Sequence, residues 1–173
     1  DDVTRYRVFY SPTKDGTFRE IDFKNSPTDT ALVHNDLGSI AGCYYVTALD
    51  SVQYNNESEP SNLVCVDNCP VYFLPNVFTP NGDGVNDVFH PILPYKFIDS
   101  IEFVIYNRWG NQIFRTTDPM ISWNGKDQET GKPVNDGVYF YVCRVYAIRL
   151  SGLSETELKG FITVYGNENS NSN

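Results

Sequence analysis

Apolar and polar residues alternate along the first part of the chain in short runs typical of half-buried β-strands. In Arg5–Ser11, the side chains of Tyr6, Val8 and Tyr10 share one face, and arginines occupy the other. A turn at 14–16 follows. Similar runs predict strands at 18–23, 30–34, 43–50 and 62–66. In the run 43–50, the residues predicted to face inward are Tyr44, Val46 and Ala48.

Strand patterns continue after position 70, separated by turns rich in Asn, Asp and Gly. They predict seven strands: Val71–Phe78, Val88–Leu93, Ile101–Asn107, Gln112–Thr116, Ile121–Trp123, Val138–Ile148 and Leu158–Tyr165. One of them has an unbroken apolar face and is expected to be central: Tyr139, Tyr141, Cys143, Val145 and Ala147. Seven short strands without a helical period indicate an immunoglobulin-like sandwich.

These patterns predict an all-β protein with two antiparallel β-sandwich modules in tandem. The first module is expected at residues 1–68, and the second at residues 69–173 with a flexible tail at 166–173. Each module is long enough to bury a modest core of its own.

The composition supports a folded protein with an acidic surface. Aromatic residues make up 14% of the 173 residues, and the formal net charge is −9. This charge argues against binding to nucleic acid and to anionic membranes. Apolar runs fall well short of the roughly 20 residues that span a bilayer, so we expect no direct membrane insertion. The N-terminus has neither an initiator Met nor a signal peptide, which leads us to expect a fragment of a larger exported precursor.

The chain contains four cysteines without a CxxC pair, and its two histidines, His34 and His90, are far apart. A zinc site is therefore not expected, and two disulfides formed in an oxidising compartment fit better. Four cysteines allow three connectivities. The strand with Cys43 is expected to pair with the strand that carries Cys65, so we favour Cys43–Cys65, which leaves Cys69–Cys143.

The loop after Phe78 carries the candidate metal ligands. Counted from Thr79, its oxygen-bearing positions match those of calcium loops, and the candidate ligands are Asn81, Asp83, the Val85 carbonyl and Asp87. Position 1 lacks a carboxylate, and His90 stands where such a loop has Glu. A tight turn whose side chains bond the local backbone is the alternative, so calcium is only a possible cofactor.

Catalytic signatures are missing from the sequence. It has no Gly-x-Ser-x-Gly motif, no plausible Cys/His pair and no phosphate-binding glycine loop. We therefore do not expect an enzyme.

The first module resembles a fibronectin type III domain. The segment 6–18 is similar to the middle hairpin of that family, and 44–48 with 56–61 is similar to its last two strands. The two strands that should precede the middle hairpin are missing, which again points to a fragment.

The second module resembles the gliding-motility-associated C-terminal domain family. Four ordered segments carry this resemblance, at 75–87, 105–110, 123–126 and 136–141, and a Lys-Gly pair in the last strand completes the order. The motif positions are Pro75, Asn76, Phe78, Thr79, Pro80, Asn81, Asp83, Gly84, Asn86, Asp87, Asn107, Arg108, Trp109, Gly110, Trp123, Gly125, Gly137, Tyr139, Lys159 and Gly160.

This resemblance implies a type B sorting domain of the type IX secretion system. Such a domain would direct a large protein across the periplasm and the outer membrane to the cell surface or the medium. The implied partners are the type IX translocon and a PorP-like outer-membrane accessory protein. The alternative is a passive surface module, such as an adhesin stalk or a β-sandwich that binds sugar or protein.

Three motifs are predicted to be structural, and for the two that contain tryptophan the alternative is a recognition feature. Arg108-Trp109-Gly110 is predicted to be a hairpin turn with a packed indole, and the alternative is a recognition feature displayed at a strand end. Trp123 is predicted to lie in the core, before a turn at Asn124-Gly125. The segment Asp136–Tyr139 resembles a tyrosine corner, in which a phenol bonds the backbone.

Overall fold

The computed structural model describes residues 3–35, 38–50 and 56–166. Within these ranges the chain forms strands and no helices, so the all-β prediction is confirmed. No described segment is a helix long and apolar enough to cross a membrane. The chain divides into two compact units. Unit 1 comprises Asp1–Asn68 with Arg149–Gly152, and unit 2 comprises Cys69–Ile148 with Leu153–Asn173.

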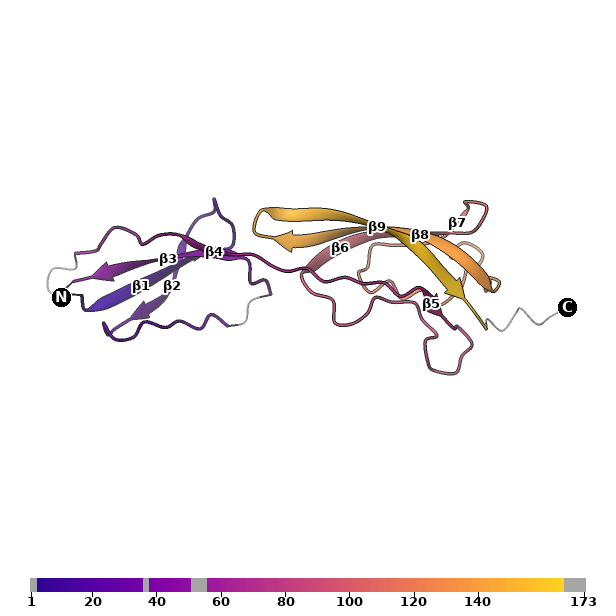
Figure 1. The fold of residues 1–173 in the computed structure, drawn as a ribbon, viewed down its shortest axis with the longest axis horizontal. Helices are drawn as coiled ribbons and strands as arrows, with labels where there is room; N and C mark the ends of the chain where they lie inside the picture. The colour runs from indigo at the N-terminus through magenta and orange to yellow at the C-terminus, as the bar shows by residue number, and fades with distance from the viewer. Residues whose placement is uncertain (1–2, 36–37, 51–55, 167–173) are drawn as a thin grey trace. The chain divides into compact units, whose positions relative to one another are not determined.

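Unit 1 contains one antiparallel sheet among its described residues (Figure 1). Its strands, in spatial order, are β2 (Arg19–Lys24), β1 (Arg5–Ser11), β3 (Gly42–Leu49) and β4 (Val64–Val66). Val8 pairs with Val46, and Tyr10 pairs with Tyr44, so the predicted apolar positions of β1 and β3 share one face.

The pairing of β3 with β4 places Cys43 directly opposite Cys65, and the two cysteines form a disulfide. This bond was predicted from the hairpin. The predicted strand at 30–34 is wrong, because this segment makes no ladder with the described residues. It instead crosses the apolar face of the sheet and borders a cleft of about 600 Å³. His34 Nδ1 lies 3.0 Å from the Tyr44 hydroxyl in this cleft.

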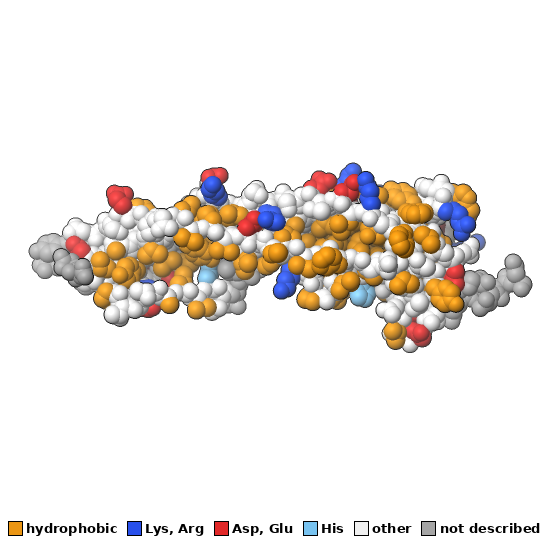
Figure 2. Space-filling model, in the orientation of Figure 1, with side chains coloured by type: hydrophobic (Ala, Val, Ile, Leu, Met, Phe, Trp, Pro, Cys, Tyr) orange, Lys and Arg blue, Asp and Glu red, His pale blue; other side chains and the backbone are white. Residues whose placement is uncertain are grey.

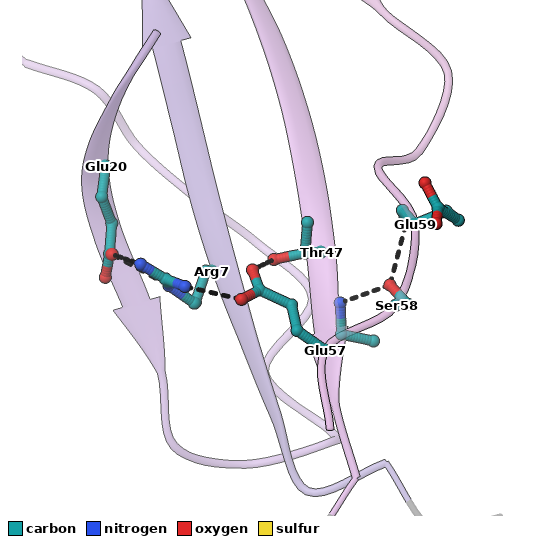
Figure 3. Close-up of polar contacts among 7 residues, drawn as sticks. Arg7, Glu20, Thr47, Glu57, Ser58 and Glu59 are labelled. Atoms are coloured by element: carbon teal, nitrogen blue, oxygen red, sulfur yellow. Dashed lines mark hydrogen bonds and ion pairs between the residues drawn. The ribbon is translucent and has the colours of Figure 1, made fainter. Parts of the chain in front are cut away.

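The opposite face of the same sheet carries a network of polar contacts (Figure 3) beside the stacked rings of Phe9 and Tyr45. The Arg7 guanidinium donates to Glu20 at 2.6 Å and to Glu57 at 2.7 Å, and the Thr47 hydroxyl donates to Glu57 at 2.5 Å. The hydrogen bond from Thr47 and the charge of Arg7 lower the pKa of Glu57. These contacts hold the chain before β4 against the sheet.

Unit 2 contains a mixed five-stranded sheet. Its strands, in spatial order, are β5 (Val77–Phe78), β9 (Gly152–Val164), β8 (Gly137–Arg149), β6 (Ile98–Tyr106) and β7 (Gln112–Thr116). β5 runs parallel to β9, so the antiparallel prediction is wrong at this edge. β8 is central, as expected. Its predicted inward residues are buried or half-buried.

A largely irregular layer covers the inner face of this sheet. Two predicted strands shrink to a single bridge, in which Phe89 and Trp123 exchange backbone hydrogen bonds of 2.7 and 3.1 Å. Ile121 and Ser122 have φ values of 62° and 57°, so the chain cannot continue there as an extended strand. Of the predicted strand 71–78 only β5 forms a ladder. Pro75 precedes it, and proline has no amide proton to donate to a ladder.

The core of unit 2 lies between the sheet and this layer. Trp123 is 1% exposed and contacts Phe78, with ring centroids 5.1 Å apart. Phe89 and Phe103 stack at 6.0 Å. The prediction that Trp123 belongs to the core is confirmed.

Candidate functional site

The loop between Thr79 and Asp87 is held by its own side chains. The Asp87 carboxylate accepts from the amides of Gly82 at 2.6 Å and Gly84 at 2.7 Å. The Asp83 carboxylate accepts from the Val85 amide at 2.8 Å. Gly82 and Gly84 have φ values of 77° and 87°, a region that glycine adopts without steric cost. The loop is therefore a closed turn.

These contacts bear on the calcium prediction. Asn81 donates from its amide nitrogen to Asp83 and accepts from the Asp83 backbone amide, so both its polar atoms are engaged inside the loop. The described residues contain no group of three or more His, Cys, Asp or Glu side chains that could hold a metal ion. Calcium would have to replace bonds that the loop already makes. The ligand set remains a prediction.

The turn between β6 and β7 is equally well defined. The Asn107 side-chain oxygen accepts from the amides of Trp109 at 3.0 Å and Asn111 at 2.9 Å. The backbone closes the turn through Gly110, which has a φ of 82° and donates to the Asn107 carbonyl at 3.0 Å. Asn107 and Gly110 therefore shape the turn, and Arg108 and Trp109 point away from it.

Trp109 does not pack as predicted. Its side chain is 76% exposed, and the Arg108 guanidinium lies over its ring at 5.3 Å from the centroid. The prediction of a packed indole is wrong, because the turn lies after the last residue of β6 and leaves most of the ring in solvent. A cation above an indole face is a favourable arrangement.

The start of β8 forms the predicted tyrosine corner. The Tyr139 hydroxyl donates to the Asn135 carbonyl at 2.8 Å, four residues upstream. Burial raises the pKa of Tyr139, and the neighbouring Arg108 acts in the opposite direction. Asp136 accepts from the Gly166 amide at 2.9 Å, which ties the start of β8 to the end of β9.

Three motif segments meet at one end of unit 2, where β9 finishes (Figure 1). Arg108 Nη2 lies 3.7 Å from the place where a Cβ on Gly137 would stand. A Cβ on Gly166 would lie 3.7 Å from Asn81. The loop at 79–87, the turn at 107–111 and the start of β8 therefore form one surface, which we call the turn end.

Further motif residues provide turns and packing contacts within unit 2. The Trp123 indole donates to the Lys126 carbonyl at 2.8 Å, and Gly125 has a φ of 74°. Gly160 lies under the Tyr141 ring, because an added Cβ would come within 2.6 Å of the Tyr141 hydroxyl. Lys159 pairs with Glu157 at 2.5 Å. Trp123, Gly125 and Gly160 therefore serve the fold, whereas Lys159 lies on the surface.

The second predicted disulfide is not formed. Cys69 and Cys143 are free thiols, and Cys69 is exposed while Cys143 is buried with no accessible surface. Cys143 faces the core from the middle of β8, where burial raises its pKa to about 12. The prediction paired the two cysteines that remained and did not weigh the place of Cys143 on the apolar face of its strand.

Tyr165 is a surface residue that the sequence patterns did not single out. It follows β9 at the turn end and is 68% exposed. The tail was expected to begin at Gly166, but the amide of this residue is bonded to Asp136. Residues 167–173 of the predicted tail lie outside the described residues.

The chain also matches a known protein family. The model of the CHU_C type IX secretion signal domain matches residues 72–164, which is more than half of the chain. The chain therefore belongs to the CHU_C type IX secretion signal domain family. This is not an enzymatic family. A search of the curated proteins found no match.

Proposed function

We propose that this chain directs a large exported protein through the type IX secretion system to the cell surface or the medium. The observation that carries the proposal is the family match, which spans β5 to β9 and therefore the whole sheet of unit 2. The translocon and a PorP-like outer-membrane protein are the proposed partners. A passive surface module is the alternative.

A transfer experiment tests this function. Residues 1–173 are fused behind a fluorescent reporter that carries its own periplasmic export signal, in a host with a type IX system. We expect the reporter at the surface or in the medium, and in the periplasm when the fusion partner is omitted. A second control uses a host without the secretion system. A fusion that stays in the periplasm while native cargo is exported contradicts the sorting role and favours the passive module.

We further propose that unit 1 is a fibronectin-like spacer between cargo and signal. Support comes from its sheet order, in which β1 of the β1–β2 hairpin pairs with β3, and β3 pairs with β4. The apolar cleft on one face of this sheet is a second observation in its favour. A spacer carries no export information. Deleting residues 1–68 from the fusion is therefore expected to leave export unchanged, with a thermal melt to check that unit 2 stays folded.

A further inference from the structure

We propose that Arg108 and Trp109 at the turn end form the docking site that a protein of the export machinery binds. The partner offers an apolar pocket of indole size with a carboxylate beside it. The inference rests on the proposed function and specifies the surface through which that function is exerted.

The exposure of Trp109 is the first reason. A tryptophan side chain offers roughly 200 Å² or more of contact surface, and three quarters of this one faces solvent. Exposed apolar residues at the start of β8 add to this surface, and one of them, Phe140, pairs with Tyr106 just before the turn. Val138 and Phe140 on β8 are 44% and 50% exposed, and β8 begins beside Arg108. Figure 2 shows hydrophobic and basic side chains together at this end.

β9 continues this apolar surface. β9 neighbours β8 in the sheet, and its Gly160 lies against Tyr141. From this contact we infer that Phe161 lies beside Phe140 on the outer face. Phe161 is 48% exposed. Several exposed apolar residues on one face of a folded domain mark an interaction site more often than scattered exposed residues do.

The charge of Arg108 is the second reason. In the part of the chain that the structure describes, Arg108 makes no ion pair, although the protein has an excess of acidic residues. Farther along the same sheet face, Arg144 is engaged by Glu102 at 3.2 Å and by Glu155 at 3.7 Å. An arginine fork with unused donors suits a carboxylate. The partner is therefore expected to be acidic where it meets Arg108.

The contacts of the turn hold the side chains of Arg108 and Trp109 in place. Two amides bond to the Asn107 side chain, and the guanidinium lies over the indole. A preformed arrangement loses little conformational entropy on binding. Tryptophan and arginine are also the residues most enriched at the energetic centres of protein interfaces.

The test uses the complete chain behind the exported reporter, with Trp109→Ala, Arg108→Ala and Arg108→Glu. The ratio of external to periplasmic reporter is expected to fall about tenfold or more for Trp109→Ala, the size of one hot-spot contact. Arg108→Glu is expected to reduce export further than Arg108→Ala, because the new carboxylate would face the partner's carboxylate.

Matched controls separate docking from general surface effects. Phe73→Ala removes an aromatic side chain that is 63% exposed outside the turn end. Arg115→Ala removes one positive charge from the exposed part of β7. Both variants are expected to be exported like the unsubstituted fusion. Thermal melts of each purified chain confirm equal folding.

The outcomes distinguish this inference from the proposed function. If the unsubstituted fusion is not exported, the proposed function fails. If it is exported and Trp109→Ala is exported equally well, the docking site is wrong and the sorting role stands. Export of Arg108→Glu at or above the level of Arg108→Ala contradicts an acidic partner. Self-association that depends on Trp109, with unchanged export, shows a second copy as the occupant and also overturns the inference.

Discussion

The two tryptophans of unit 2 stand in similar sequence contexts and in opposite environments. Trp109 is followed by Gly110 and Trp123 by Asn124-Gly125, and in both places a glycine with positive φ forms part of a tight turn. Trp123 is 1% exposed and its indole nitrogen donates to a backbone carbonyl, whereas Trp109 is 76% exposed beneath a guanidinium. The comparison teaches that similar turn residues beside an indole say little about whether the ring serves the fold or a partner.

Replacing each tryptophan by alanine gives the largest contrast. Trp123→Ala empties the centre of the aromatic cluster and is expected to lower the free energy of unfolding of unit 2 by about 3–5 kcal/mol. Trp109→Ala is expected to lower it by less than about 0.5 kcal/mol, because the ring is already in water. Denaturant unfolding followed by tyrosine fluorescence measures both. Equal losses for the two variants would contradict the assignment of separate roles.

An intermediate effect is expected when the turn is loosened and both exposed side chains are kept. Asn107→Ala leaves the amides of Trp109 and Asn111 without their acceptor and is expected to cost about 1 kcal/mol. Export of the fusion should fall less than it does for Trp109→Ala, because Arg108 and Trp109 are still present but are held less rigidly. Gln112→Ala, at the exposed start of β7, serves as a control for a lost amide side chain. A variant that unfolds unit 2 outright would contradict a local role for Asn107.

The smallest effect concerns the loop at the same end. The hydrogen bond from Asn81 and the Val85 amide lower the pKa of Asp83. A lowered folded pKa means that the contribution to stability is present above the unfolded value near 3.9 and is lost as the pH falls through the folded pKa. Exchange protection of the Val85 amide is therefore expected to decrease at acidic pH, below about 4. If the exchange protection of the Val85 amide stays constant down to pH 2, the hydrogen bond to the Asp83 carboxylate is contradicted.

Two controls sharpen this last measurement. Asp83→Asn should remove the pH dependence of the Val85 amide. Calcium added at neutral pH should leave the thermal midpoint of unit 2 unchanged, since the carboxylates already accept backbone amides. A midpoint that rises with calcium and returns with chelator would establish the metal site instead.

Much of the fold was readable from local patterns. The faces of β1 and β3, the central place of β8 and the Cys43–Cys65 bond follow from alternation and from hairpin pairing. The layer opposite the sheet of unit 2 was not readable. Ile121 has an apolar strand composition but a φ of 62°, and the parallel pairing of Val77 with Thr163 joins residues far apart in sequence. Local propensity does not encode such long-range choices.

Some features of the candidate site were likewise readable from the sequence, and others were not. The sequence by itself determined the turns, because glycine adopts positive φ at low cost and the side chains of asparagine and aspartate bond the nearby backbone. It also determined the family, through the ordered motifs of the second module. Tertiary structure alone decided that three of these turns meet at one end, that Trp109 is exposed and that Cys143 is buried. Exposure depends on which segments pack above a side chain, and those segments are distant along the chain.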